Sequence, residues 1–220
     1  MRLYIEHNER NDSDMELMQA ILERRSVRQF LDEPIPDQDL RDIIDAARWA
    51  PSASNQQMWK FVIIKNKTIL AQMSQLVIDK IDKLSVESGR AELHGAKSYS
   101  TFFNQAPVTI SVFMKPYGKN KSEEAFRSLG YSEQEIQRLR GYVDIQSIGA
   151  AIQNILLAAH VKGYGTCWMC APNIAAPEIE KLLEAEEPWQ LKALIPLGRP
   201  AQIPKPTSRK ALDEILEIIG

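Results

Sequence analysis

The amino-acid sequence predicts a sandwich of the α/β or α+β class, because apolar strands alternate with amphipathic helices along the chain. Residues 61–64 are a continuous apolar run, which is typical of a buried strand, and the largely apolar residues 107–114 are expected to form the next strand. Apolar residues recur at helical spacing over 37–50 and, almost without a break, over 142–162. The chain has 220 residues, of which 44% are hydrophobic and 25% charged, so it can bury a core.

The N-terminal part of the chain opens with a polar segment, 1–12, which we expect to be a flexible arm. Ser13 then begins a helix, with Glu16 at the spacing of a capping box. Asp37 suits the N-cap of a second helix. The elements expected here are an apolar helix face formed by Leu17, Met18, Ile21 and Leu22, a helix at 37–50 that Pro51 ends, a strand at 61–64 and a helix at 67–84.

The remaining elements alternate in the same way. Gly163 suits the C′ position that closes a helix, and Pro196 indicates an edge strand or a bulge. The elements expected, in order, are a strand at 107–114, a charged surface excursion or lid at 115–140, a helix at 142–162, a strand at 165–169, a helix at 177–185, a strand at 191–198 and a helix or arm at 211–219.

The domain organisation follows from the even composition. No Pro/Gly/Ser-rich linker, repeat or low-complexity tract divides the sequence, so we expect residues 13–220 to form one domain. Within it, 85–140 is mixed and polar over much of its length, and we expect it to be a variable lid or excursion.

Composition also excludes several classes of protein. The formal net charge of -2 argues against broad neutralisation of nucleic-acid phosphates. The sequence has no signal-peptide pattern and no apolar stretch long enough to span a bilayer, and two cysteines cannot make a disulfide framework. We therefore expect a cytoplasmic protein with neither a nucleic-acid nor a membrane partner.

Two polar segments are the candidates for a binding site. Arg24, Arg25, Ser26 and Arg28 place three guanidiniums and a hydroxyl within five residues, directly after the first helix. Guanidiniums suit bidentate contact with phosphate. The second segment, 51–57, is a loop rich in hydroxyls and amides, which suit a sugar-like chain and a heteroaromatic edge. Read alone, the arginines are equally a basic patch at a helix C-terminus, and the loop a plain turn.

Further motifs accompany these two segments in a fixed order. The set comprises Arg-Arg-Ser-Val-Arg-x-Phe at 24–30, Ala-Pro-Ser-x-x-Asn-x-Gln-x-Trp-x-Phe at 50–61, Gln-Asn-x-Leu-Leu-x-Ala at 153–159, Gly-x-Gly-Thr-Cys-Trp at 163–168, Leu-Gly-Arg-Pro at 197–200 and Arg-Lys at 209–210. Each motif is weak alone. Together they cover nearly all of the chain after residue 13 and resemble the FMN-dependent nitroreductase family.

This resemblance implies a fold, a cofactor and an assembly. The fold would be α+β, a three-layer sandwich with a mostly antiparallel central sheet flanked by helices. The protein would be an intertwined homodimer with FMN at the subunit interface. NADH or NADPH would reduce the flavin, and the flavin would then reduce a small-molecule acceptor such as a nitroaromatic or a quinone, in a ping-pong sequence. The helix at 142–162 would then be an interface helix rather than only a core helix.

The resemblance also implies a role for each site residue. Arg24 and Ser26 would hold the FMN phosphate, with Arg25 beside them and Arg209 closing from the C-terminal side. Arg28 would approach the N1/O2 edge of the flavin, where a cation favours the reduced form. The partner subunit would supply Pro51, Ser52, Ser54, Asn55 and Gln57. Along the flavin near N5, where a backbone N–H can meet it, would lie Met169, Cys170 and Ala171.

The sequence departs from the family pattern at a few positions. Met58 replaces the proline usual before the tryptophan, and Cys170-Ala171 stands where some relatives have Glu-Gly. Cys167 and Cys170 have the spacing of a redox or metal motif, but there is no second pair and the segment is expected to be a strand. The three histidines are scattered, so no metal site is expected.

Other functions stay open at this point. Within the same family, the chain could be specialised for reductive dehalogenation or for flavin fragmentation. From a different class, it could bind FMN without turnover, as a store or sensor. A phosphate-binding module without a flavin is the third alternative.

Overall fold

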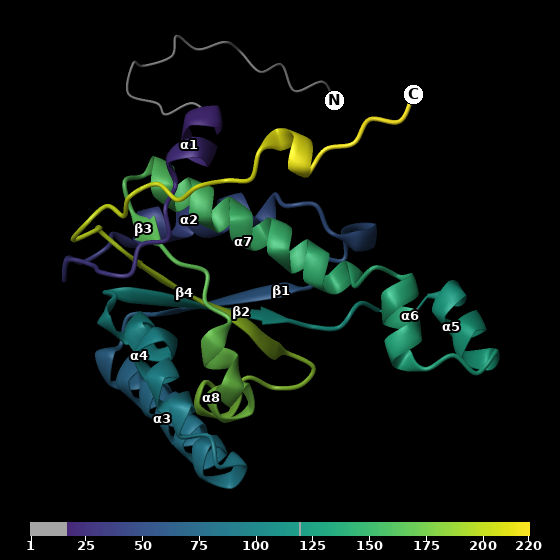
Figure 1. Cartoon of the computed structure of the whole chain (residues 1–220), viewed down its shortest axis with the longest axis horizontal. Helices are drawn as coiled ribbons and strands as arrows, with labels where there is room; N and C mark the ends of the chain where they lie inside the picture. Colours follow the sequence, from purple (N-terminus) through teal and green to yellow (C-terminus); the bar gives the residue numbers. More distant parts are fainter. Residues whose placement is uncertain (1–16, 119) are drawn as a thin grey trace.

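A four-stranded antiparallel sheet lies at the centre of the molecule, with helices on both faces (Figure 1). The computed structural model describes residues 17–118 and 120–220. The strand order is β1-β2-β4-β3, and the bounds are β1 Trp59–Ile64, β2 Val108–Met114, β3 Gly165–Thr166 and β4 Gln190–Gly198. The three layers and the antiparallel pairing confirm the predicted α+β sandwich.

Helices form the outer layers and the projections from them. The α-helices are α1 Leu17–Glu23, α2 Asp37–Arg48, α3 Lys67–Ser88, α4 Ala96–Thr101, α5 Lys121–Ser128, α6 Glu133–Leu139, α7 Val143–Val161 and α8 Ala176–Leu182. Short 3-10 turns are η1 Ala53–Asn55, η2 Ala91–Gly95, η3 Phe102–Gln105, η4 Ala171–Ala175 and η5 Leu212–Glu214. In the part of the chain that is described, no helix is long and apolar enough to cross a membrane.

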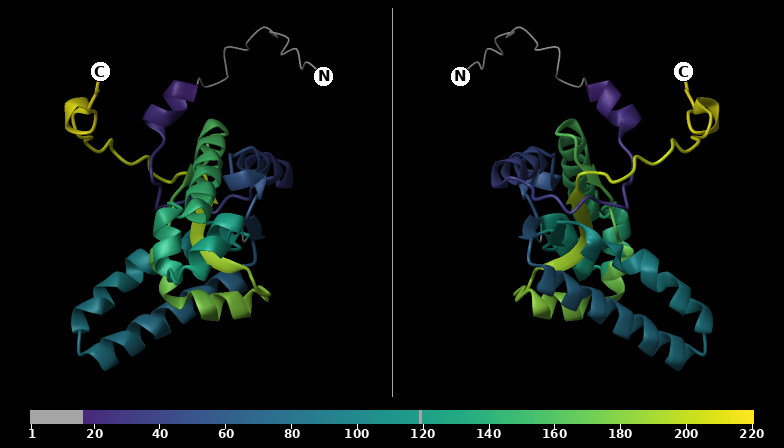
Figure 2. Two further views of the ribbon diagram at one scale, coloured as in Figure 1. Left: turned by 90° about the vertical axis from the view of Figure 1, so that its right-hand side faces the viewer. Right: turned by 90° about the vertical axis from the view of Figure 1, so that its left-hand side faces the viewer.

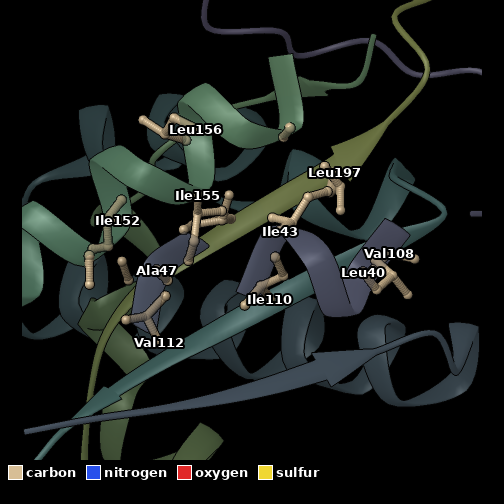
Figure 3. Packing of buried hydrophobic residues seen from close by; sticks show 14 of the residues in the cluster. Leu40, Ile43, Ala47, Val108, Ile110, Val112, Ile152, Ile155, Leu156 and Leu197 are labelled. Atoms are coloured by element: carbon tan, nitrogen blue, oxygen red, sulfur yellow. The ribbon is translucent and has the colours of Figure 1, made fainter. Parts of the chain in front are cut away.

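The core on one face of the sheet is packed by α2 and α7 (Figure 3). Alternate residues of β2 point into it, because successive side chains on a strand point to opposite faces. Figure 3 shows these side chains meeting those of the two helices, and the labelled residues are Leu40, Ile43, Ala47, Val108, Ile110, Val112, Ile152, Ile155, Leu156 and Leu197. This packing confirms the helical periodicity read at 37–50 and 142–162.

A second core on the opposite face is covered by α3 and α8. Its β-strand contributions include Ile64, Phe113 and Leu194. All seven residues of β2 are buried, which explains why five of them are apolar and why its two polar residues, Thr109 and Ser111, are small.

The C-terminal end of α7 bears out the predicted role of Gly163. Its φ of 77° is left-handed, and its N–H bonds to His160 O at 2.8 Å while the N–H of Tyr164 bonds to Ala159 O at 2.9 Å. This pair of bonds is the Schellman arrangement that ends a helix. The chain then turns directly into β3.

Two sequence predictions are wrong in detail. Asp37 is the first residue of α2 rather than its N-cap, and its carboxylate pairs with Lys65 Nζ at 2.6 Å. Pro196 lies neither on an edge strand nor in a bulge, because β4 is interior and Pro196 pairs with Thr109.

Pro196 has a different effect, on the strand predicted at 165–169. The register that pairs Gly165 with Gly198 and Met169 with Leu194 places Cys167 opposite Pro196. Proline has no N–H to donate to that pair. The ladder is therefore interrupted, and β3 is only two residues long, with Met169 forming an isolated bridge.

Only part of the 85–140 segment lies outside the sandwich. Residues 108–114 are the central strand β2, and α4 packs against α3. The part that projects is the α5–α6 hairpin beyond one end of the sheet (Figure 1), which matches the excursion predicted at 115–140. Figure 2 shows that α3 also extends away from the body of the molecule. The predicted N-terminal arm and the helix start at Ser13 lie outside the described residues.

Candidate functional site

The arginine-rich segment 24–28 runs alongside β3. Ser26 forms a parallel bridge with Thr166, and the N–H of Val27 bonds to Thr166 O at 2.9 Å. A Cβ built on Gly165 would lie 2.6 Å from Val27 Cγ2 and 2.7 Å from Val27 Cβ. Because Gly165 has no side chain, segment 24–28 can approach β3 this closely. The contact sets the position of the arginines relative to the sheet.

Three guanidiniums gather at this segment. Burial lowers the pKa of Arg24 from its ordinary value, and the positive charges of Arg25 and Arg209 lower it further. Among the described residues, no ion pair joins any of these three to a carboxylate. Arg24 and Arg25 are partly buried and Arg209 is exposed. Such a cluster could accept an anion, because a bound anion would relieve the repulsion among the three positive charges.

Arg25 is partly committed to the helix that precedes it. Its Nη1 donates to Leu22 O at 2.7 Å and to Arg24 O at 2.9 Å. These bonds satisfy carbonyls at the C-terminal end of α1. Arg25 therefore acts as a basic residue at a helix C-terminus, the structural alternative to a binding role. Its positive charge still adds to that of the cluster.

Ser26 and Arg28 line a small pocket of about 210 Å³ together with Gln29, Gln202 and Pro204. Arg28 is exposed, and its Nη1 donates to Ser26 O at 3.2 Å. The N–H of Ala201 bonds to Gln29 O at 3.0 Å and so joins the two segments. Gln29, Gln202 and Pro204 are not among the site residues expected from the sequence. The only signal for them is position: Gln29 is the variable residue of the 24–30 motif, and Gln202 and Pro204 come two and four positions after the Leu-Gly-Arg-Pro motif.

Cys167 lies beside this pocket and differs from Cys170. Burial raises the pKa of the Cys167 thiol, an effect that the nearby Arg28 charge and a hydrogen bond from Ser26 partly oppose. Cys167 is buried, Cys170 is exposed, and both are free thiols.

The 51–57 loop has an unusual backbone. Ser54, Asn55 and Gln57 all have left-handed φ, between 48° and 53°, although none is a glycine. Ser52 Oγ accepts from the N–H of Gln57 at 3.0 Å, and Ser147 Oγ of α7 accepts from the N–H of Ala53 at 3.1 Å. The loop therefore has a strained backbone that hydrogen bonds to the Ser52 and Ser147 side chains hold in place.

Within one chain, the structure does not bring the loop and the arginine cluster together. The loop is bonded to Ser147 near the N-terminal end of α7, whereas the charges of Arg24 and Arg25 act on His160 near its C-terminal end. At 1.5 Å per residue these two positions are roughly 20 Å apart along the helix axis. The two halves of the predicted site therefore lie at opposite ends of α7.

The third predicted group, 169–171, follows the interrupted strand. The N–H of Met169 already donates to Leu194 O at 3.0 Å, and the Met169 side chain is buried in the core on the α3 side of the sheet. Cys170 is exposed and Ala171 begins η4. Of the three residues predicted to offer a backbone N–H to a ligand, Met169 is therefore excluded, and Cys170 and Ala171 are left.

Comparison with known proteins gives these features a family. The model of the nitroreductase family matches residues 21–199, which include the arginine segment, the loop and β3. The chain belongs to the nitroreductase family. This nitroreductase chain is 27% identical over 194 residues to a Methanothermobacter thermautotrophicus protein provisionally named NADH dehydrogenase/NAD(P)H nitroreductase, with 87% of the chain and 81% of the relative covered. It is 28% identical to an iodotyrosine deiodinase of Hydra vulgaris, with 88% of the chain and 69% of the relative covered.

Solved structures of this family superpose on the nitroreductase chain over nearly all of its length. A BluB-like flavoprotein of Clostridium difficile matches with a TM-score of 0.84 and 34% identity, covering 94% of this chain and all (100%) of that one. A Desulfovibrio desulfuricans protein provisionally named a nitroreductase, and solved in complex with FMN, matches with a TM-score of 0.63 and 27% identity, covering 96% and 99%.

Proposed function

We propose that the protein is an FMN-dependent oxidoreductase that takes electrons from NADH or NADPH and passes them to a flat electrophile such as a nitroaromatic or a quinone. The observation that supports this most is the cluster of Arg24, Arg25 and Arg209, in which Arg24 and Arg25 are partly buried and none of the three has a carboxylate partner in an ion pair among the described residues. In a nitroreductase-family chain, such a cluster suits the phosphate end of FMN.

The residues present fit this cofactor from end to end. Arg24 and Arg209 supply charge for the phosphate and Ser26 supplies a hydroxyl, while Arg28 faces a pocket with room for further polar contacts. Bound FMN would supply the hydride chemistry. Arg28 would contribute a permanent positive charge at the N1/O2 edge, where charge concentrates on reduction. Cys170 and Ala171 would offer backbone N–H groups near N5.

We further propose that the site is completed by a second copy of the chain, which would supply the 51–57 loop. The separation of about 20 Å along α7 between loop and cluster supports this, because it leaves the two at opposite ends of that helix within one chain. Ser52, Ser54, Asn55 and Gln57 would contact the FMN bound mainly by the partner, with Pro51 setting the start of the loop.

Exposed apolar surface supports the homodimer. Leu17, Met18, Ile21 and Leu22 of α1 are between 45% and 67% exposed, so no residue of the described ranges 17–118 and 120–220 covers the apolar face that the sequence predicts. The C-terminal segment also projects from the body (Figure 2), with Leu212, Ile215, Leu216, Ile218 and Ile219 exposed. A groove of about 800 Å³ between α2 and the edge strand β1, lined partly by Trp59, Phe61 and Ile63, offers such a segment a place on a partner.

Anaerobic reduction tests the proposed function. The purified protein should turn yellow with FMN, lose its colour with NADH or NADPH and regain it when a nitroaromatic is added. A protein that stays colourless after mixing with FMN would rule out every flavin function. A yellow protein that neither pyridine nucleotide bleaches would indicate the storage or sensor alternative instead.

Reductive dehalogenation is the second candidate, and the Hydra vulgaris iodotyrosine deiodinase relative is the observation that favours it. The same reduced protein separates the two. Reoxidation by an iodophenol with release of iodide would indicate dehalogenation, whereas reoxidation by the nitroaromatic alone indicates the leading function.

A further inference from the structure

The strained 51–57 loop is held from outside by the segment that leads into the α5–α6 hairpin. Tyr117 Oη and Ser54 Oγ lie 2.9 Å apart, and the N–H of Gly118 bonds to Gln56 Oε1 at 2.9 Å. These residues are more than 60 positions apart in the sequence. Two consecutive residues therefore bind two side chains of the loop, on either side of Asn55.

The loop needs such support, because its conformation is costly. Left-handed φ angles of 52° at Ser54, 53° at Asn55 and 48° at Gln57 fall within four consecutive positions. A residue with a Cβ typically loses about 1–2 kcal/mol there. Such residues keep this conformation only where their surroundings determine it.

Tyr117 is itself fixed by the hairpin. Arg140, which follows α6, lies over the Tyr117 ring at 4.7 Å from its centre. Hydrogen bonds from Ser54, Arg140 and Asn120 lower the pKa of the Tyr117 phenol. Arg140 also lies 3.5 Å from Glu123, a nearly buried carboxylate of α5. The hydroxyl that meets Ser54 is therefore anchored to both helices of the hairpin.

We infer that Tyr117 is a positioning residue for the flavin site: its hydroxyl holds Ser54 in the left-handed conformation that presents the 51–57 loop to FMN. The inference rests on the proposed function for the place of the loop in that site. The α5–α6 hairpin would then contribute to the binding site indirectly. The hairpin holds Tyr117 in place, and Tyr117 holds the loop through its hydrogen bond to Ser54.

A hydroxyl deletion tests the inference. Tyr117→Phe keeps the ring under Arg140 and removes the hydroxyl, with its hydrogen bonds to Ser54, Arg140 and Asn120. We expect the Kd for FMN, measured by quenching of flavin fluorescence, to rise about tenfold, the size of one hydrogen bond. Tyr131→Phe, in the same hairpin and packed on Phe126 with 5.3 Å between ring centres, is the matched control and should bind like the wild type.

Two further measurements separate positioning from general destabilisation. Ser54→Ala should weaken FMN binding at least as much as Tyr117→Phe does, because it removes a hydroxyl of the proposed site as well as the bond to Tyr117. The double variant should bind no more weakly than Ser54→Ala, because the bond between the two residues is already lost there. Thermal unfolding of the flavin-free Tyr117→Phe protein should match that of Tyr131→Phe. Unchanged FMN affinity in Tyr117→Phe, or losses that add in the double variant, would overturn the inference.

Hydrogen exchange gives a readout that needs no flavin. In the flavin-free protein, Tyr117→Phe should speed exchange of the amides of Asn55, Gln56 and Gln57, whereas Tyr131→Phe should not. Equal exchange in the two variants would also overturn the inference. If the wild type binds no FMN but exchange still responds, the proposed function fails and only the structural part of the inference, the support of the loop by Tyr117, stands.

Discussion

Arg24 and Arg28 are four positions apart, but their surroundings give them different properties. Arg24 is half-buried beside two other guanidiniums, and its pKa is lowered first by burial and then by the positive charges of Arg25 and Arg209. Arg28 is exposed and lies at the mouth of a pocket, next to Ser26. Arg24 therefore suits an anion that neutralises the positive charges of the cluster. Arg28 suits the edge of a ligand that becomes negatively charged on reduction.

Removing Arg24 should therefore weaken binding. We expect Arg24→Ala to raise the Kd for FMN by about 10- to 100-fold, because a charge-assisted hydrogen bond contributes about 1.5–3 kcal/mol. Fluorescence titration measures this effect. Arg138→Ala, on the exposed side of α6, is a control with the same change of charge. Full FMN occupancy of Arg24→Ala after gel filtration would contradict the phosphate assignment.

Removing Arg28 should instead alter the redox equilibrium. We expect Arg28→Ala to lower the two-electron reduction potential of bound FMN by roughly 30 mV, equivalent to about 1.4 kcal/mol, because the reduced flavin loses a compensating positive charge. An anaerobic potentiometric titration of wild type and variant gives the difference. An unchanged potential would remove Arg28 from the N1/O2 edge.

At the scale of elements, the contact between β3 and the 24–28 segment decides where the cations lie. Gly165→Ala should displace that segment, because its new Cβ would overlap Val27 Cβ, which no rotamer change can move. We expect at least a tenfold rise in the Kd for FMN and a lower melting temperature. Gly149→Ala is the control, since its Cβ would meet Trp168 at 3.6 Å, an ordinary contact. Wild-type affinity in Gly165→Ala would show that the cations do not depend on this contact.

The sequence predicted the elements well where periodicity or local chemistry decides them. The α2 and α7 stripes, the β2 run and the Gly163 cap are set by neighbours within a few residues. It failed where a distant residue decides. The Asp37 carboxylate pairs with Lys65, which is distant in the sequence, and does not cap the helix. The strand predicted at 165–169 is interrupted opposite Pro196, some 30 residues further along the chain.

The same limit applies to the candidate site. Arg24, Arg25 and Arg28 can be predicted as a group because they are close together in the sequence. The structure adds Arg209, whose charge acts on Arg24. The left-handed backbone of Ser54, Asn55 and Gln57 carries no glycine signal, and its support by Tyr117 joins segments 63 positions apart. The N–H of Met169 is taken by Leu194, a pairing that no local pattern reveals.

At the scale of the whole molecule, both faces of the sheet are covered, whereas α1 and the C-terminal segment keep apolar side chains exposed. The apolar residues of the edge strand β1 are only partly buried, apart from Ile64. Apolar side chains at this density in a projecting segment are unfavourable for an isolated chain. The proposed dimer would cover them.

Removing the segment should therefore weaken the assembly. A chain ending at Lys210 keeps Arg209 and loses the five exposed apolar residues of 211–220. We expect its dimer Kd, measured by sedimentation velocity, to rise at least tenfold, because burying even one such side chain contributes about 1.5–3 kcal/mol. The double variant Asp213→Asn, Glu217→Gln changes the charge of the segment but keeps its apolar residues, and should stay dimeric. An unchanged dimer in the shortened chain would count against this role.

The placement of the two half-sites at opposite ends of α7 has a genetic consequence. In the proposed dimer, a chain altered at Arg24 and a chain altered in the 51–57 loop would each bind FMN weakly at both sites when expressed alone. In a mixed dimer, one site would receive both damaged halves and the other both intact halves. Coexpressed, two defective alleles of this gene should therefore complement each other, with one working flavin per mixed dimer.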